Sequence, residues 1–145
     1  MITVREMQID DLEQVLPIEE ANFSDPWTMN GFFSFLLRED ALFLVAEEEG
    51  RILGYCGAIL TPPESDITNV CVEESSRRRG IGRQLIESLR DRLRQMNTDT
   101  LHLEVRESNQ GAITLYENLG FVRDGLRPGY YERPTEDAIL MSAHF

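Results

Sequence analysis

The strongest constraint on the fold is a run of apolar residues at helical spacing in the middle of the chain. Ile81, Leu85, Leu89, Leu93 and Met96 recur at steps of three and four residues. This spacing places them on one face of an α-helix. The stretch SDITNVCV before them is apolar and ends at a polar, glycine-containing segment, which is typical of a strand. The centre of the chain therefore predicts a strand followed by a long helix.

The N-terminal half continues this mixed pattern. ITVRE predicts a first strand, and residues 9–23 predict a helix that begins near Asp10 or Asp11 and that Pro17 would bend or break. TMNGFFSFLL predicts a second helix. ALFLVAEEEGRILGYCGAIL is two apolar runs joined by an acidic, glycine-containing turn, which predicts a hairpin.

The C-terminal half predicts the remaining elements. TLHLEV alternates strictly, so it predicts a fifth strand. SNQGAITLYENLG predicts a helix that begins at a Ser108 or Asn109 cap and ends at Gly120. FVRDGLRPGYY and EDAILMSAHF complete what we expect to be a mixed α/β sheet.

Composition limits the class of protein. The chain has 145 residues and a formal net charge of −12. This length predicts a single domain over residues 1–145. No apolar run approaches the roughly 18 residues of a membrane span, and the first residues lack a signal-peptide pattern, so we expect a cytoplasmic protein. The acidic charge argues against nucleic acid as a partner and favours a basic one.

Cysteine and histidine are too sparse to indicate a metal site. Cys56 and Cys71 lie in apolar runs without metal-ligand spacing, which favours reduced thiols in the core. His102 and His144 are far apart in the sequence, with no third ligand candidate beside either. We therefore expect no metal.

One short segment concentrates positive charge. SSRRRGIGR, residues 75–83, holds four of the chain's 14 basic residues and lies between the predicted strand and the long helix. The first turn of a helix has unpaired N–H groups and a partial positive charge, glycine lets an anion approach, and arginine adds charged donors. The segment suits a phosphate, and especially a pyrophosphate. A solvated surface patch is the alternative, since the net charge disfavours a nucleic-acid patch.

The motifs carry a family resemblance. RRRGIG resembles the Q/R-x-x-G-x-G/A acetyl-coenzyme A motif of the GCN5-related N-acetyltransferases (GNAT). LHLEVRESNQGAITLYENLGF, DPWT and GYY with EDAILM resemble the RimI-type ribosomal-protein-alanine N-acetyltransferases of that family. The resemblance runs essentially from end to end. It implies the GNAT fold, a mixed and mostly antiparallel α/β sheet that is splayed at the fourth and fifth strands and flanked by helices.

The resemblance also implies which residues bind acetyl-CoA as cosubstrate. Val70, Cys71 and Val72 would offer backbone groups to the pantetheine arm, and Asn109 would hydrogen-bond to it. The residues that would hold the pyrophosphate are Arg78, Arg79, Gly80, Ile81, Gly82 and Arg83.

Glu104 and Tyr116 are, by the same resemblance, the general base and the general acid. The alternation of LHLEVR places Glu104 on one face with His102 and Arg106, which is also what an ordinary solvent-facing strand shows. Arg106 would lower the pKa of Glu104 and burial would raise it. Tyr116 follows Asn109 by about two helical turns, so both can face one cleft, although a core tyrosine fits the same spacing.

The implied reaction is direct attack of a protein N-terminal amine, such as the alanine of a small-subunit ribosomal protein, on the thioester in a ternary complex. Trp27, Tyr130 and Tyr131 fit either the mouth of a peptide site or an ordinary aromatic role. Other readings keep the fold and change the acceptor to a lysine or a small amine, or remove catalysis in favour of an acyl-CoA sensor. An adaptor that uses the acidic surface is a third class.

Overall fold

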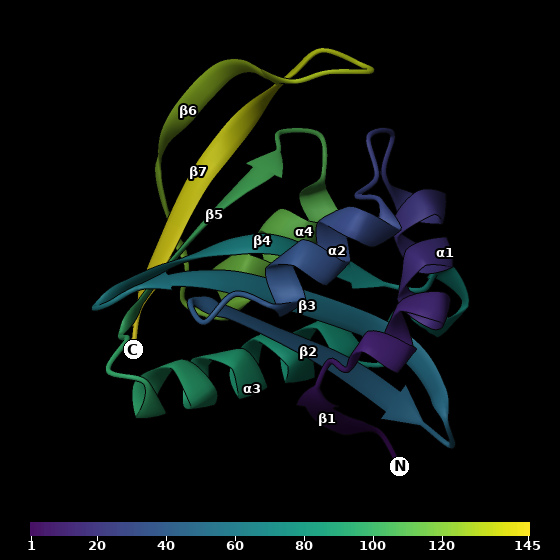
Figure 1. Cartoon of the computed structure of the whole chain (residues 1–145). Helices are drawn as coiled ribbons and strands as arrows, with labels where there is room; N and C mark the ends of the chain where they lie inside the picture. Colours follow the sequence, from purple (N-terminus) through teal and green to yellow (C-terminus); the bar gives the residue numbers. More distant parts are fainter.

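The computed structural model describes residues 1–145 and contains one seven-stranded sheet in the order β1-β2-β3-β4-β5-β7-β6 (Figure 1). The strands are β1 (Thr3–Glu6), β2 (Ala41–Glu48), β3 (Arg51–Thr61), β4 (Glu64–Val72), β5 (Thr100–Arg106), β6 (Val122–Tyr131) and β7 (Glu136–His144). The helices are α1 (Leu12–Asn22), α2 (Met29–Leu36), α3 (Ile81–Gln95) and α4 (Gln110–Asn118). The mixed α/β fold expected from the sequence is confirmed.

The two faces of the sheet carry separate apolar cores. The larger core of 23 buried residues joins the sheet to α3 and α4, and a second core of 10 residues joins it to α1 and α2. The predicted helix over residues 81–96 is confirmed as α3, in which Leu85, Leu89 and Leu93 are fully buried. Met96 follows as the capping residue and is exposed.

Pro17 lies inside α1 without ending it. The helix begins after a short turn at Ile9–Asp11, close to the predicted start, and its last residue is Asn22. A proline removes the hydrogen bond to the carbonyl of the residue four positions earlier. Here that residue, Glu13, is exposed, so water can bind the freed carbonyl. The expected disturbance of the helix therefore does not break it.

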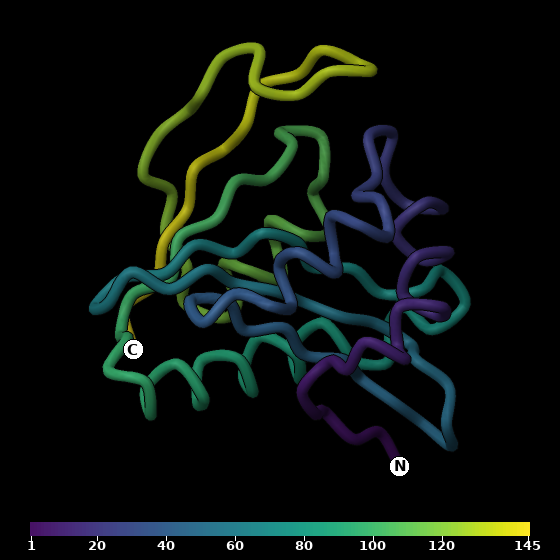
Figure 2. Tube along the Cα trace, viewed as in Figure 1, coloured from purple at the N-terminus to yellow at the C-terminus, as the bar shows by residue number.

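Strand β4 is antiparallel to β3 but parallel to β5, and its two pairings have very different lengths. Pairing with β3 runs from Glu64 to Val72, whereas pairing with β5 ends at Asp66, opposite His102. Beyond that point the strands part, and β5 rises with β6 and β7 away from the rest of the sheet (Figure 2). The splay expected between the fourth and fifth strands is confirmed.

A bulge in β4 lies beside this separation. Asn69 pairs with Gly57 and Ile67 pairs with Ala58, so Thr68 is an extra residue. A bulge reverses which side chains face which side of the sheet. Ile67 accordingly belongs to the α3 side of the core, while Cys71 belongs to the α1 side.

No helix of the chain combines the length and the apolar composition needed to cross a lipid bilayer.

Gly57 of β3 provides a test of this packing. The ring of Phe43 lies over it so closely that an added Cβ would be 2.1 Å from a ring carbon. We expect Gly57→Ala to lower the free energy of unfolding by about 1–3 kcal/mol, as overpacking does. Urea denaturation followed by circular dichroism measures this.

Gly111→Ala is the matched control. Gly111 lies in α4, and an added Cβ there would meet nothing within 4 Å. We expect its stability to be unchanged or raised by up to about 1 kcal/mol, because alanine favours helix. Equal stability of Gly57→Ala and the wild-type protein would contradict the packing described above.

Candidate active site

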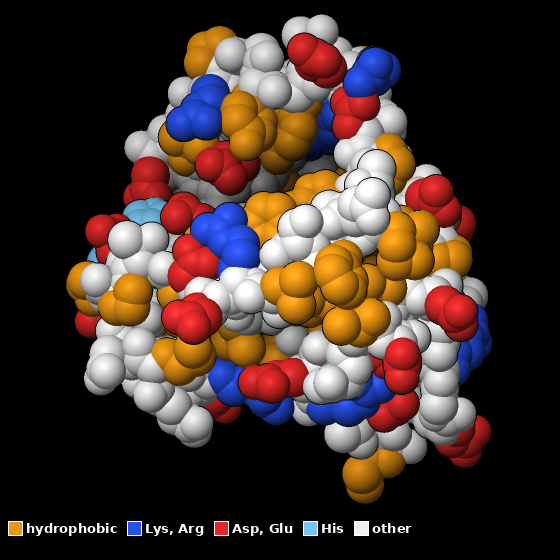
Figure 3. Space-filling model, viewed as in Figure 1, with side chains coloured by type: hydrophobic (Ala, Val, Ile, Leu, Met, Phe, Trp, Pro, Cys, Tyr) orange, Lys and Arg blue, Asp and Glu red, His pale blue; other side chains and the backbone are white.

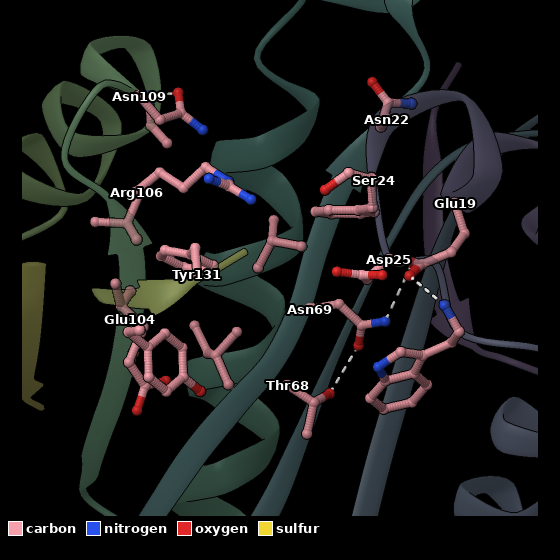
Figure 4. Close-up of a pocket in the computed structure, with 18 of the residues that line it drawn as sticks. Glu19, Asn22, Ser24, Asp25, Thr68, Asn69, Glu104, Arg106, Asn109 and Tyr131 are labelled. Atoms are coloured by element: carbon pink, nitrogen blue, oxygen red, sulfur yellow. Dashed lines mark hydrogen bonds between the residues drawn. The ribbon is translucent and has the colours of Figure 1, made fainter. Parts of the chain in front are cut away.

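A cavity of about 680 Å³ lies where β4 and β5 part. Its walls come from α1 and the loop after it, from β4, β5 and α4, and from the β6–β7 hairpin (Figure 4). On the surface, the same face of the molecule is hollowed beneath the hairpin (Figure 3). Of the predicted site residues, Val70, Glu104, Asn109 and Tyr116 line this cavity.

Glu104 enters the cavity from β5. The predicted alternation is confirmed, since Leu103 and Val105 are buried and Glu104 is half-buried on the opposite face. Arg106 does not pair with Glu104, because its guanidinium binds the Glu136 carboxylate at 3.2 Å and two carbonyls of the β6–β7 loop. Glu104 is thus left in the cavity without a cationic partner.

Tyr131 lies beside Glu104 (Figure 4). Burial, and then the nearby Glu104 carboxylate, raise the pKa of Tyr131 to about 12. The Tyr131 hydroxyl therefore keeps its proton at neutral pH and can act as a hydrogen-bond donor in the cavity.

Tyr116 combines a core ring with an accessible hydroxyl. Its side chain is 7% exposed and its ring centroid is 5.5 Å from that of Phe121. Every fully buried polar side-chain atom has a hydrogen-bond partner, and the Tyr116 hydroxyl has none within the chain. That hydroxyl must therefore reach the cavity. Burial raises the pKa of Tyr116 above its ordinary value, so the hydroxyl is protonated.

Asn109 caps α4, so of the two caps predicted, Ser108 and Asn109, the second is confirmed. Its side-chain oxygen accepts a hydrogen bond from the amide of Ala112 at 3.2 Å. The cap fixes the side chain, and its NH₂ group remains free to donate toward the cavity.

The edge of β4 exposes alternate backbone groups. The amide of Glu73 donates to the carbonyl of Leu53, so the paired groups of the antiparallel ladder fall on Glu73 and Cys71. Val70 and Val72 are the intervening residues, and their backbone groups point to the open edge. Of the three predicted residues, two thus present free amides, while the amide of Cys71 is directed at Tyr55 of β3.

The turn before α3 presents a second set of free amides. Gly80 is the capping residue, with a left-handed φ of +76° and no side-chain cap over the first turn. Glycine adopts this conformation readily. At position 82 glycine is favoured for a different reason, because an added Cβ would lie 3.0 Å from the side chain of Leu115 in α4. The first glycine shapes the turn and the second permits close helix packing.

The arginines of this turn differ in their engagement. Arg79 forms a close ion pair with Glu48 at 2.8 Å, whereas Arg83 is more loosely paired with Glu87, at 3.8 Å. Arg78 is exposed and has no ion pair. Arg78 and Arg83 are therefore the side chains most available to an anion, which would bind beyond the cavity at the start of α3.

The sequence prediction missed Glu19 as part of the cavity lining, and it gave Arg77 no role beside the cavity. Arg77 donates to the carbonyl of Val72 and to Asn22, so it joins the end of β4 to the end of α1. Glu19 is buried and lines the cavity. Its spacing from Leu12 and Val15 continues the apolar stripe of α1, which was the available signal.

The mouth of the cavity is aromatic and acidic. Trp27, Tyr130 and Tyr131 all line it, and the Trp27 ring also stacks on Phe35 with centroids 4.6 Å apart. Trp27 thus lines the cavity and also packs against the second core, while a role in binding peptide stays a prediction. The acidic residues of the lining outnumber its single arginine and are Glu19, Asp25, Glu104 and Glu132.

Comparison with known proteins adds to this geometry. The family model described as acetyltransferase (GNAT) family matches residues 7–121. The ribosomal protein bS18-alanine N-acetyltransferase of Escherichia coli K12 is 35% identical over 98% of this chain and 97% of its own. The N-alpha-acetyltransferase RimI of Mycobacterium tuberculosis is 32% identical over 97% of this chain and 90% of its own.

A solved structure agrees with these relatives. The crystal structure of the ribosomal-protein-S18-alanine N-acetyltransferase from Escherichia coli superposes with a TM-score of 0.92 and 34% identity. The match covers 99% of this chain and 94% of that one. The resemblance read from RRRGIG and from residues 101–121 is confirmed, and the chain belongs to the acetyltransferase (GNAT) family.

Proposed function

We propose that this chain, acting as a single domain in the cytoplasm, transfers the acetyl group of acetyl-CoA to the N-terminal α-amine of a protein. The acceptor we propose is the N-terminal alanine of a small-subunit ribosomal protein, the substrate named for relatives that match almost the whole chain. The observation that carries the proposal is the cavity in which Glu104 lacks a cationic partner and the Tyr116 hydroxyl is accessible. Its acidic mouth favours a cationic acceptor.

The backbone supports the proposed seat for acetyl-CoA. The free amides of Val70 and Val72 lie on the open edge of β4, where the pantetheine arm and the thioester carbonyl need donors. The uncapped first turn of α3 and the side chains of Arg78 and Arg83 fit the pyrophosphate. Asn109 offers its free NH₂ group to the arm from the other wall.

Glu104 and Tyr116 supply the proton transfers in this proposal. Glu104 takes a proton from the α-ammonium group, directly or through water, and the neutral nitrogen attacks the thioester carbon. The carbon–sulfur bond breaks, and the Tyr116 hydroxyl protonates the departing thiolate. The nitrogen then loses its second proton to the Tyr116 phenolate, which leaves a neutral amide and restores the hydroxyl. A protein α-amine has a pKa of about 7.7–8.0 and is roughly 10–20% neutral at pH 7, so one carboxylate is an adequate base.

A covalent acetyl-enzyme is not part of the proposal. Burial raises the pKa of the Cys71 thiol to about 11, so it remains a thiol at neutral pH. The thiolate is the nucleophilic form. Direct transfer in a ternary complex is therefore the mechanism that the site supports best.

Two peptides of identical length test the acceptor. One begins with a free alanine, and the other has its N-terminus blocked and carries one internal lysine. We expect mass spectrometry to detect acetylation of the first peptide at a rate at least about tenfold above the second, because lysine is almost entirely charged at pH 7. Equal rates, or transfer to neither peptide, would contradict the proposed acceptor.

Glu104→Gln and Tyr116→Phe test the proton transfers. We expect Glu104→Gln to lower kcat by about 10- to 100-fold at pH 7, and by less at pH 9, where the acceptor amine is already neutral. Tyr116→Phe keeps the ring beside Phe121 and should slow the acetyl-transfer step in single-turnover measurements.

The control is Glu107→Gln, which makes the same change at an exposed residue outside the cavity lining. Acetyl-CoA affinity, measured by calorimetry, should stay within about twofold in all three variants. Wild-type turnover in both active-site variants would remove the catalytic assignment.

The pyrophosphate seat is tested by removing the free arginines. We expect the double variant Arg78→Ala and Arg83→Ala to bind acetyl-CoA about tenfold more weakly or worse, since each charged hydrogen bond contributes about 1.5–3 kcal/mol. Its affinity for acetyl-pantetheine, which lacks the diphosphate, should not change. Arg94→Ala near the opposite end of α3 is the control. Equal losses for both ligands would place the diphosphate elsewhere.

A further inference from the structure

We propose that Glu19 is a positioning residue that fixes the wall of the acceptor cavity by closing the loop between α1 and α2. This inference rests on the proposed function, because it assigns the cavity to the acceptor. It concerns a residue that takes no part in the proton transfers described above.

The Glu19 carboxylate is buried and held by neutral donors from three parts of the chain. Glu19 is only 2% exposed. It accepts hydrogen bonds from the Tyr55 hydroxyl at 2.6 Å, the Trp27 amide at 2.9 Å and the Asn69 side chain at 3.4 Å. Figure 4 shows the last two as dashed lines converging on the carboxylate. No arginine or histidine pairs with it, so these hydrogen bonds alone offset its desolvation.

The bond to the Trp27 amide closes the loop at its base. Glu19 lies in the last turns of α1, and Trp27 ends the segment that leads to α2. Phe23, Ser24 and Asp25, which lie between them, all line the cavity. A loop whose two ends are joined has far fewer conformations than an open one. Glu19 thus determines where this wall stands.

The bond to Asn69 places that wall relative to the sheet. Asn69 follows the bulge at Thr68, whose hydroxyl donates to the Asn69 side-chain oxygen at 2.7 Å. Val70, the next residue, presents its amide on the open edge of β4. Glu19 therefore links the wall of the acceptor cavity to β4, whose open edge binds the thioester in the proposed function. The two linked residues are 50 positions apart in the sequence.

Glu19→Gln breaks this arrangement while preserving its shape. The amide has one accepting oxygen, so either the Trp27 amide or the Asn69 NH₂ group must face its NH₂ group and lose its bond, whereas the Tyr55 hydroxyl can turn to accept. We expect the peptide KM to rise about tenfold or more, with kcat and the acetyl-CoA Kd within about twofold of the wild-type values. Glu20→Gln makes the same change at the exposed neighbouring position and is the control.

Glu19→Asp keeps the carboxylate group and shortens the side chain by one methylene. We therefore expect it to lose the hydrogen bond to the Trp27 amide. We expect the same rise in peptide KM as for Glu19→Gln. Tyr55→Phe removes one donor but keeps the bond to Trp27, so its KM should stay close to the wild-type value.

Tryptophan fluorescence tests the hydrogen bond between Glu19 and Trp27 without an enzymatic assay. Trp27 is the single tryptophan of the chain. If Glu19 holds the base of the loop, acrylamide should quench Trp27 more strongly in Glu19→Gln and Glu19→Asp than in the wild-type protein, Glu20→Gln or Tyr55→Phe. Circular dichroism confirms that each variant is folded, and Glu19→Asp carries the test if Glu19→Gln does not fold.

Two results would overturn the inference. The first is wild-type quenching and wild-type KM in the Glu19 variants. The second is a parallel loss of kcat and acetyl-CoA affinity, which would show a general effect on stability. If the wild-type protein acetylates no peptide, the proposed function fails, while the quenching measurement still decides whether Glu19 holds the loop.

Discussion

The site depends on how little β4 and β5 pair. Their parallel ladder involves only three residues of each strand and ends at Asp66 and His102. Unpaired backbone groups in a partly enclosed place must bind water or a ligand, because leaving them unsatisfied is costly. The separation of two strands thus creates both a cavity and a row of amides facing it. The bulge at Thr68 adds to this effect, since it turns Cys71 toward the core while the amides of Val70 and Val72 stay on the open edge.

The cavity has two walls that are fixed by different interactions. On one side, Glu19 holds the segment that follows α1, and Arg77 holds the last residue of α1. On the other side, Arg106 stacks on Tyr131 with its guanidinium carbon 4.5 Å from the ring centroid, and it binds carbonyls at the hairpin tip. Arg133 and Asp25 form an ion pair that joins the two walls. Arg106 therefore fixes the hairpin wall and leaves Glu104 without a cationic partner, which suits the role of base that we propose for it.

Much of the fold was predictable because its signals are local. The apolar spacing of α3 and the alternation of β5 depend on neighbours within a few residues. The family motifs then identified Glu104, Asn109 and Tyr116, which the structure brings to one cavity. The rest depends on contacts between distant segments. The pairing register directs the Cys71 amide at β3, and the bonds of Glu19 to Tyr55 and Asn69 span 36 and 50 residues. Neither leaves a local pattern, apart from the place of Glu19 in an apolar stripe.

Amide hydrogen exchange with and without acetyl-CoA tests the central claim, that the open edge of β4 receives the cosubstrate. We expect acetyl-CoA to slow exchange at the amides of Val70 and Val72 and in the first turn of α3. The Cys71 amide, already directed at β3, should change little. Saturating acetyl-CoA that leaves Val70 and Val72 exchanging as fast as in the free protein would contradict it.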